Sequence, residues 1–184
     1  MKKDISVKTV VATAIGVALF VVVGRFGSIP TGIPNTEFSL AYPILGLIGV
    51  LFGPIAGGLT GLIGHALKDA VFYGSVWWSW VISSAILGIL FGLIGKKLKV
   101  EQGKFSLKDI VLFNIFQVIS NLIVWAVVAP VGDVLIYSEP ANKVYTQGLV
   151  ASLVNSVGIG IACTIIFAVY AKTRVQKGSL SKED

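Results

Sequence analysis

The sequence is poor in charge: 13% of its 184 residues are Asp, Glu, Lys or Arg, whereas 55% are hydrophobic. A mean hydropathy of +0.87 excludes an ordinary soluble domain, which must cover its core with a polar surface. The alternating pattern of a membrane β-barrel is also absent. Because a backbone in lipid must satisfy its own hydrogen bonds, the composition predicts an all-α membrane protein.

Cysteine and histidine occur once each, as Cys163 and His65. A single cysteine excludes an internal disulfide and a cysteine-based zinc cluster, and we interpret Cys163 as a small core residue. The chain has no phosphate loop, which excludes ATP hydrolysis by that route, and no H-E-x-x-H or G-x-S-x-G motif. Its basic segments lack the interleaved aromatic residues of nucleic-acid binders. We therefore expect no metal, no cofactor of its own and no nucleic acid.

Apolar segments long enough to cross a bilayer predict a bundle of six transmembrane helices in one domain, residues 1–184. The spans cover residues 7–24, 38–52, 54–72, 76–95, 107–128 and 147–171. The first span follows Met-Lys-Lys, as a signal sequence would. No small-x-small cleavage site follows it, so we interpret it as a retained helix.

The basic residues predict the orientation of this bundle. With the N-terminus inside, twelve of the 15 Lys and Arg residues fall in inner segments, and only Arg25, Lys68 and Lys143 fall outside. Positive charge concentrates on the cytoplasmic side of membrane proteins. Both termini are therefore predicted to be cytoplasmic.

Two outer segments, residues 24–38 and 129–147, are too long for simple turns and contain proline and glycine. Long loops that are not linkers usually act as lids or binding loops. We therefore place the ligand on the outer side, with Arg25 and Asn35 of the first loop among its candidate contacts.

The outer end of the third span carries His65, Lys68 and Asp69, which share one helical face because they lie three and four residues apart. In one interpretation Lys68 extends to the interface, Asp69 pairs with Lys68 or Arg25, and His65 packs. In the other, this face borders a hydrated ligand cavity.

Aromatic residues follow directly as Tyr73, Trp77, Trp78 and Trp80. They could form an aromatic belt at the outer membrane interface. Alternatively, some of the indoles face the bundle and stack on a flat ring system.

Amide side chains form a stripe along the fifth span, where Asn114, Gln117, Asn121 and then Trp125 lie on one face. Asn155 is the centre of a weaker polar patch in the sixth span. Buried amides need partners, so these residues either join helices by hydrogen bonds or line a pocket.

Small residues in the first span form two overlapping pairs, Ala12 with Gly16 and Ala14 with Ala18. Each pair gives a flat surface for another helix, either inside the bundle or on a partner protein. The tetrapeptide Gly-Leu-Ile-Gly, which begins at Gly46, Gly61 and Gly92, is likewise interpreted as a packing motif because its spacing is irregular.

The stretches GRFGSIPTGIPN, FGPIAGGLTGLIGHALKD and YGSVWWSWVISSAILGILFGLIGKKLK, together with ATAIGVA in the first span, resemble the substrate-binding S components of energy-coupling-factor (ECF) vitamin transporters. The resemblance is to the riboflavin-type subfamily, some of whose members are assigned to cobalamin. It is close over spans one to four and architectural beyond them.

This resemblance implies a bacterial cell-membrane subunit that captures a B-type vitamin outside and works with an ECF transmembrane coupling protein and two ABC-type ATPases. Ala14 and Ala18 would form the docking face, flanked by Ala12 and Gly16. The long outer loops favour cobalamin slightly over riboflavin. Two alternatives stay open: a self-sufficient secondary transporter, and a membrane enzyme that uses His65 and Asp69 as an acid–base pair.

Overall fold

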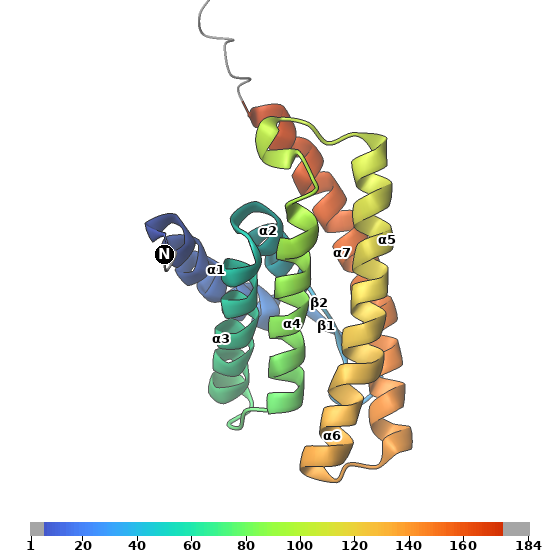
Figure 1. The fold of residues 1–184 in the computed structure, drawn as a ribbon. Coiled ribbons are helices and arrows are strands. Elements are labelled where there is room, and N and C mark those ends of the chain that lie inside the picture. The colour runs from blue at the N-terminus through green and yellow to red at the C-terminus, as the bar shows by residue number, and fades with distance from the viewer. Residues whose placement is uncertain (1–5, 175–184) are drawn as a thin grey trace, which may run out of the picture.

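The computed structural model describes residues 6–174 and consists mainly of helices (Figure 1). The helices are α1 (Val7–Phe26), α2 (Ala41–Phe52), α3 (Pro54–Phe72), α4 (Trp78–Gly95), α5 (Leu107–Ile123), α6 (Ala129–Tyr137) and α7 (Ala141–Thr173). Two short strands, β1 (Ser28–Pro30) and β2 (Glu37–Ser39), pair antiparallel as a hairpin. A 3₁₀ turn, η1 (Val100–Gln102), precedes α5, and a π turn, η2 (Val124–Val128), joins α5 to α6.

Four helical stretches in the described residues are long and apolar enough to cross a membrane: Val7–Phe26, Trp78–Gly95, Leu107–Tyr137 and Ala141–Thr173. Their outward faces are apolar, with exposed side chains such as Ile119, Leu153 and Ile161. This arrangement suits hydrocarbon surroundings and confirms the predicted helical membrane protein. The count of six spans stays a prediction. The helix α2 has only 12 residues, and the glycines and charged residues of α3 make it less apolar.

The second outer segment, residues 129–147, was expected to be a loop and is instead mostly helical. The stretch Leu107–Tyr137 runs through α5, η2 and α6, and α7 begins at Ala141. Pro130 suggested a loop, but it directly follows the π turn η2, and a proline within a continuous helix is accommodated where such a turn interrupts the regular hydrogen bonding. The chain reverses at Ser138, which has a left-handed backbone with φ of 55°. The first outer segment is the β1–β2 hairpin, with Ile29 opposite Phe38.

Glycines bring α2, α3 and α4 into backbone contact. A Cβ added at Gly57 would overlap the Gly88 carbonyl oxygen, and one added at Gly61 would overlap that of Ser84. The terminal glycines of all three Gly-Leu-Ile-Gly sequences meet neighbouring helices or side chains in the same way. Their interpretation as packing motifs is therefore confirmed. In Figure 1, α3 and α4 run side by side, as do α5 and α7.

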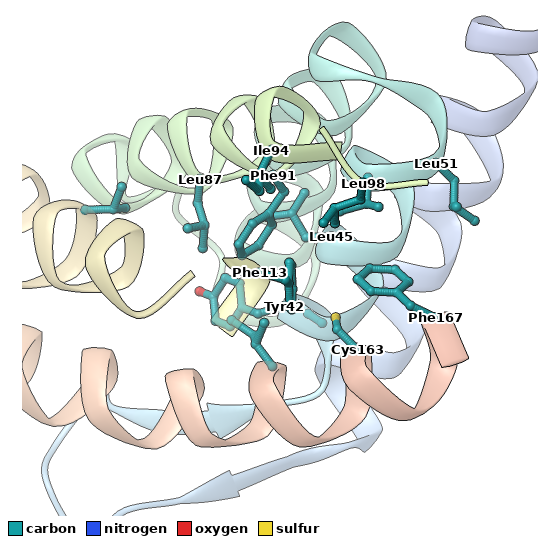
Figure 2. Close-up of a cluster of buried hydrophobic side chains, with 14 of the residues drawn as sticks. Tyr42, Leu45, Leu51, Leu87, Phe91, Ile94, Leu98, Phe113, Cys163 and Phe167 are labelled. Atoms are coloured by element: carbon teal, nitrogen blue, oxygen red, sulfur yellow. The ribbon is translucent and has the colours of Figure 1, made fainter. Parts of the chain in front are cut away.

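An aromatic core joins α4, α5 and α7. The ring of Phe113 lies 6.3 Å from that of Phe91 and 5.2 Å from that of Phe167, measured between centroids. Cys163 is fully buried in the same cluster, as expected of a small core residue (Figure 2). This core fixes the spacing between the glycine-packed helices and the long pair α5 and α7.

Residues near the start of α1 and just after the end of α7 both contact Glu101 of η1. Lys8 of α1 forms an ion pair with Glu101, at 3.0 Å between Nζ and Oε1. The Arg174 Nε–H, just after α7, donates to the Glu101 carbonyl oxygen at 3.2 Å. The α6–α7 turn lies at the other end of the molecule, with the α3–α4 turn (Figure 1).

The glycine contacts predict a difference between two adjacent positions of α3. In Gly57→Ala the new methyl group meets backbone atoms, so α3 must move away from α4, whereas in Gly58→Ala it meets the Ile89 side chain. We expect Gly57→Ala to lower the free energy of unfolding by about 1–3 kcal/mol and Gly58→Ala to lower it less. Unfolding in mixed micelles measures both, and equal losses would contradict this packing.

Candidate ligand-binding cavity

A cavity of about 670 Å³ lies among the β1–β2 hairpin, the C-terminal end of α3, the N-terminal end of α4, and α6 and α7. Its wall is part aromatic and part charged. Eight of the residues proposed from the sequence as ligand contacts line it: Asn35, His65, Lys68, Asp69, Tyr73, Trp77, Trp80 and Asn155. The helices α3, α4 and α7 and the hairpin thus bring residues far apart in the chain to one volume.

Six other proposed residues do not line the cavity: Arg25, Trp78, Asn114, Gln117, Asn121 and Trp125. Arg25 is exposed and lies over the Phe72 ring, 5.4 Å from its centroid. Trp78 is 49% exposed, and its backbone N–H donates to the Tyr137 hydroxyl. Trp77 is the N-cap of α4 and Trp78 its first residue, so the two side chains leave the backbone in different directions, and only Trp77 lines the cavity.

The amide stripe joins helices, which is the first of the two interpretations left open by the sequence. Asn114 donates to Thr164 Oγ1 and Gln117 to the Ser156 carbonyl oxygen, both at 3.0 Å, so α5 is joined to α7. Asn121 accepts from the Trp125 indole N–H at 3.0 Å.

Trp125 lies one layer behind the cavity wall. Its ring is fully buried and stacks on that of Trp80, with 5.3 Å between centroids. The stripe therefore supports the wall without being part of it.

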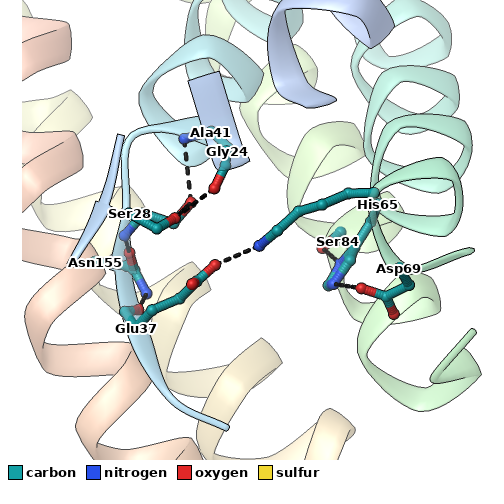
Figure 3. Close-up of polar contacts among 10 residues, drawn as sticks. Gly24, Ser28, Glu37, Ala41, His65, Asp69, Ser84 and Asn155 are labelled. Atoms are coloured by element: carbon teal, nitrogen blue, oxygen red, sulfur yellow. Dashed lines mark hydrogen bonds and ion pairs between the residues drawn. The ribbon is translucent and has the colours of Figure 1, made fainter. Parts of the chain in front are cut away.

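His65 and Asp69 are held by neighbours on α4 and the α3–α4 turn. His65 Nδ1 lies 2.6 Å from Ser84 Oγ, and its Nε2 lies 3.4 Å from Asp69 Oδ1 (Figure 3). Asp69 also accepts the Trp77 backbone N–H at 3.1 Å. A carboxylate in the last turn of α3 that accepts the backbone N–H of Trp77, the N-cap residue of α4, fixes where α4 begins. These contacts set the start of α4 and hence the position of its indoles.

An ion pair across the cavity joins α3 to the hairpin. Lys68 Nζ pairs with Glu37 Oε1 and also lies 5.7 Å from the centroid of the Tyr73 ring. Lys68 is 6% exposed, whereas the Glu37 side chain is 28% exposed, so only the lysine is shielded from solvent. Both charges remain next to the cavity, where a ligand can reach them.

Side chains of α7 hold the hairpin in place. Asn155 accepts the Ser39 backbone N–H at 2.9 Å and donates to the Glu37 carbonyl oxygen at 3.2 Å (Figure 3). Gln147 donates to the Pro34 carbonyl oxygen at 2.7 Å. The backbone of the hairpin is therefore attached to side chains of α7. The sequence of residues 24–38 alone does not reveal this attachment.

Asp133 of α6 is a cavity residue that the sequence reasoning missed. Its carboxylate accepts hydrogen bonds from the Trp77 and Trp80 indole N–H groups, each at 2.7 Å, and from the Ser79 hydroxyl. A lone carboxylate in an apolar stretch is itself an indication of function. It was overlooked because residues 129–147 were read as a loop.

The remaining cavity residues that were missed include Glu37 and Tyr42, together with Glu139, Lys143 and Gln147 near the α6–α7 turn. Lys143 pairs with Glu139 at 2.6 Å. Within residues 6–174, no group of three or more His, Cys, Asp or Glu residues is placed to hold a metal ion. The arrangement is suited to binding a small molecule by ring stacking and hydrogen bonds.

The model of the family described as "ECF-type riboflavin transporter, S component" matches residues 4–172 of this chain. The chain belongs to this S-component family. A "UPF0397 protein" of Enterococcus faecalis strain V583 is 56% identical over 183 residues, which is 100% of each chain. A protein of the same name from Staphylococcus aureus strain Newman is 57% identical over 182 residues, 99% of each chain. The family consists of transporter subunits and not of enzymes.

The contacts of this S component predict that Asn155 limits the motion of the hairpin. Asn155→Ala removes two hydrogen bonds to β2, each worth about 1 kcal/mol, so amide exchange in residues 28–39 should become at least about tenfold faster. Hydrogen–deuterium exchange with mass spectrometry measures this. Ser152→Ala is the control, because the Ser152 hydroxyl bonds only within α7, to Leu149. Equal exchange in wild type and Asn155→Ala would contradict the attachment.

Proposed function

We propose that this S component binds a B-type vitamin in the 670 Å³ cavity on the outer face of the membrane and delivers it through an ATP-driven ECF module. The observation that carries the proposal is the cavity itself. It combines aromatic rings with paired charges and a hairpin cover, at the end of the molecule opposite the contacts of Lys8 and Arg174. Its volume falls within the range of about 300–1,000 Å³ typical of small-molecule sites.

The cavity volume favours riboflavin over cobalamin, which reverses the slight preference drawn from loop length. Riboflavin has one flat three-ring system and a short hydroxylated chain. The rings of Trp77 and Trp80 offer stacking surfaces, and Asn35 and Gln147 are candidate partners for the polar chain. Cobalamin is several times larger, so the hairpin and the α6–α7 turn would have to move outwards to admit it.

The proposed orientation places both termini in the cytoplasm. Lys8 and Arg174 contact the same residue, Glu101, so the two ends of the described chain lie together. The lysines of the α4–α5 connection lie at this end too, as the positive-inside rule requires of the cytoplasmic side. Lys2, Lys3, Lys177 and Lys182, also counted for this orientation, lie outside the described residues.

The surface of α1 favours one of the two small-residue pairs as the docking face. Ala12 and Gly16 are buried, and a Cβ added at Gly16 would lie 2.7 Å from Thr60 Oγ1 of α3. Ala14 and Ala18 are exposed on the opposite side. Ala14 and Ala18 are thus free to meet a helix of the coupling protein, whereas Ala12 and Gly16 serve internal packing.

No specific observation favours either of the two alternatives, a membrane enzyme or a self-sufficient secondary transporter. His65 and Asp69 contact Ser84, each other and the Trp77 backbone, which is a structural arrangement as much as an acid–base pair. A self-sufficient transporter typically places its site between inverted repeats near the membrane midplane. The cavity here lies towards one end of the bundle and is covered by a hairpin.

Adjacent tryptophans give a direct test of vitamin binding. Trp77→Ala removes a ring of the cavity wall and should weaken riboflavin binding at least about tenfold, since an aromatic contact of this kind contributes about 0.5–1.5 kcal/mol beyond its buried area. Trp78→Ala removes an exposed ring outside the cavity and should change affinity less than twofold. Flavin fluorescence quenching during titration measures both. Absence of riboflavin binding by the wild-type protein would refute this choice of vitamin.

Docking predicts a variant that binds its ligand but does not transport it. Ala14→Leu or Ala18→Leu adds bulk to the exposed face of α1 without reaching the cavity, so binding should be unchanged while uptake falls at least about tenfold. Uptake is measured in proteoliposomes that contain the ECF module and ATP. Normal uptake by both variants would move the interface elsewhere. Uptake by the chain alone, without ATP, would favour the secondary transporter.

A further inference from the structure

Asp133 is a buried carboxylate with an unusual set of partners. It is 2% exposed, and its three hydrogen-bond donors are two indole N–H groups and one hydroxyl. No Lys or Arg among the described residues lies within ion-pair distance of it. Burying an unpaired charge is costly, so hydrogen bonds from fixed donors must stabilise it here.

The two indoles are each held at two points. Trp77 donates to Asp133 and stacks on Tyr137, with 4.3 Å between centroids and 27° between ring planes. Trp80 donates to the other oxygen of Asp133 and stacks on Trp125, at 5.3 Å and 25°. A stack fixes the plane of a ring, and an N–H bond fixes its rotation within that plane. The carboxylate therefore sets the direction in which both rings face the cavity.

The π turn η2 aligns Asp133 with the wall behind these rings. Trp125 and Asp133 are eight residues apart, which on an uninterrupted α-helix of about 100° per residue would separate them by about 80° around the axis. A π turn takes about one residue more than an α turn and reduces this offset to roughly 20°. Both residues then face α4, where Trp80 contacts each of them.

We propose that Asp133 is a positioning residue that holds Trp77 and Trp80 as a preformed aromatic wall for the flat ring of the ligand. The proposal rests on the proposed function and adds a residue that acts through the indoles. A preformed wall spares the ligand the cost of ordering two large side chains on binding. Asp133 orients the two indole rings, and the rings themselves contact the ligand.

The first arm of the test needs no ligand. Indole N–H signals are recorded on the protein labelled with ¹⁵N-tryptophan in nanodiscs and assigned with Trp77→Phe and Trp80→Phe. In wild type, the Trp77 and Trp80 N–H protons should exchange slowly with solvent. Asp133→Asn, which keeps one acceptor oxygen, should speed exchange at one indole, and Asp133→Leu should speed it at both. Unchanged exchange in Asp133→Leu would overturn the proposal.

The second arm measures riboflavin affinity as a double-mutant cycle. Asp133→Asn should weaken binding at least about tenfold in wild type but less than about twofold in the Trp77→Phe/Trp80→Phe background, because the donors through which it acts are gone. Asp109→Asn, at the α5 N-terminus and outside the cavity, is the matched control and should leave affinity unchanged. Equal losses in both backgrounds would overturn the positioning role.

The two failures are distinguishable. If wild type binds riboflavin and Asp133→Asn binds it equally well, the positioning role is overturned and the proposed function stands. If wild type binds neither riboflavin nor cobalamin, the proposed function fails, and the assigned role of Asp133 towards a ligand fails with it.

Discussion

The structure depends on one constraint: hydrocarbon offers no hydrogen-bond partner, so the polar groups within the bundle depend on partners inside the protein. Two solutions appear in different places. Along α5, amide side chains bond to α7 and to one another, as Gln117 and Asn121 do. Around the cavity, charges pair across elements, as Lys68 does with Glu37, or collect neutral donors, as Asp133 does. The first solution joins helices, and the second leaves polar groups at the edge of an open volume.

Packing explains why the open volume lies where it does. Glycines let the backbones of α3 and α4 touch along most of their length, and the Phe91, Phe113 and Phe167 rings fill the space between α4 and the α5–α7 pair. Towards the α6–α7 turn the lining changes to Tyr42, Trp77, Trp80 and charged side chains, and the helices no longer close on each other. The hairpin β1–β2 then covers the gap through its bonds to Asn155 and Gln147.

Helix positions were largely predictable from the sequence, because transmembrane helices appear in a sequence as long apolar segments. The expected third span, residues 54–72, coincides with α3, since Pro54 marks its start. The role of Cys163 and the packing glycines were predictable for the same reason. The helix α6 was not: Pro130 and Gly132 suggest a loop, and only the preceding π turn and the bonds to Asp133 show why a helix forms there.

The cavity was predictable in part. The face that carries His65, Lys68 and Asp69 was found because three and four residues are one helical turn, a local rule. Which of two adjacent indoles faces inward depends on where α4 begins, and that is set by the Asp69 contact with the Trp77 backbone. The amides of α5 could be assigned to helix joining or to the cavity only once α7 was placed beside them. Contacts between residues far apart in the chain produce no periodic pattern in a single sequence, so they could not be predicted from it.

Native mass spectrometry of the protein purified from its native membrane tests the central claim most directly. The account predicts one bound B-type vitamin per chain, retained in the gas phase and absent from a variant whose cavity is blocked, such as Ala151→Trp on α7. A wild-type protein that carries no vitamin, and gains none when riboflavin and cobalamin are supplied, would contradict it.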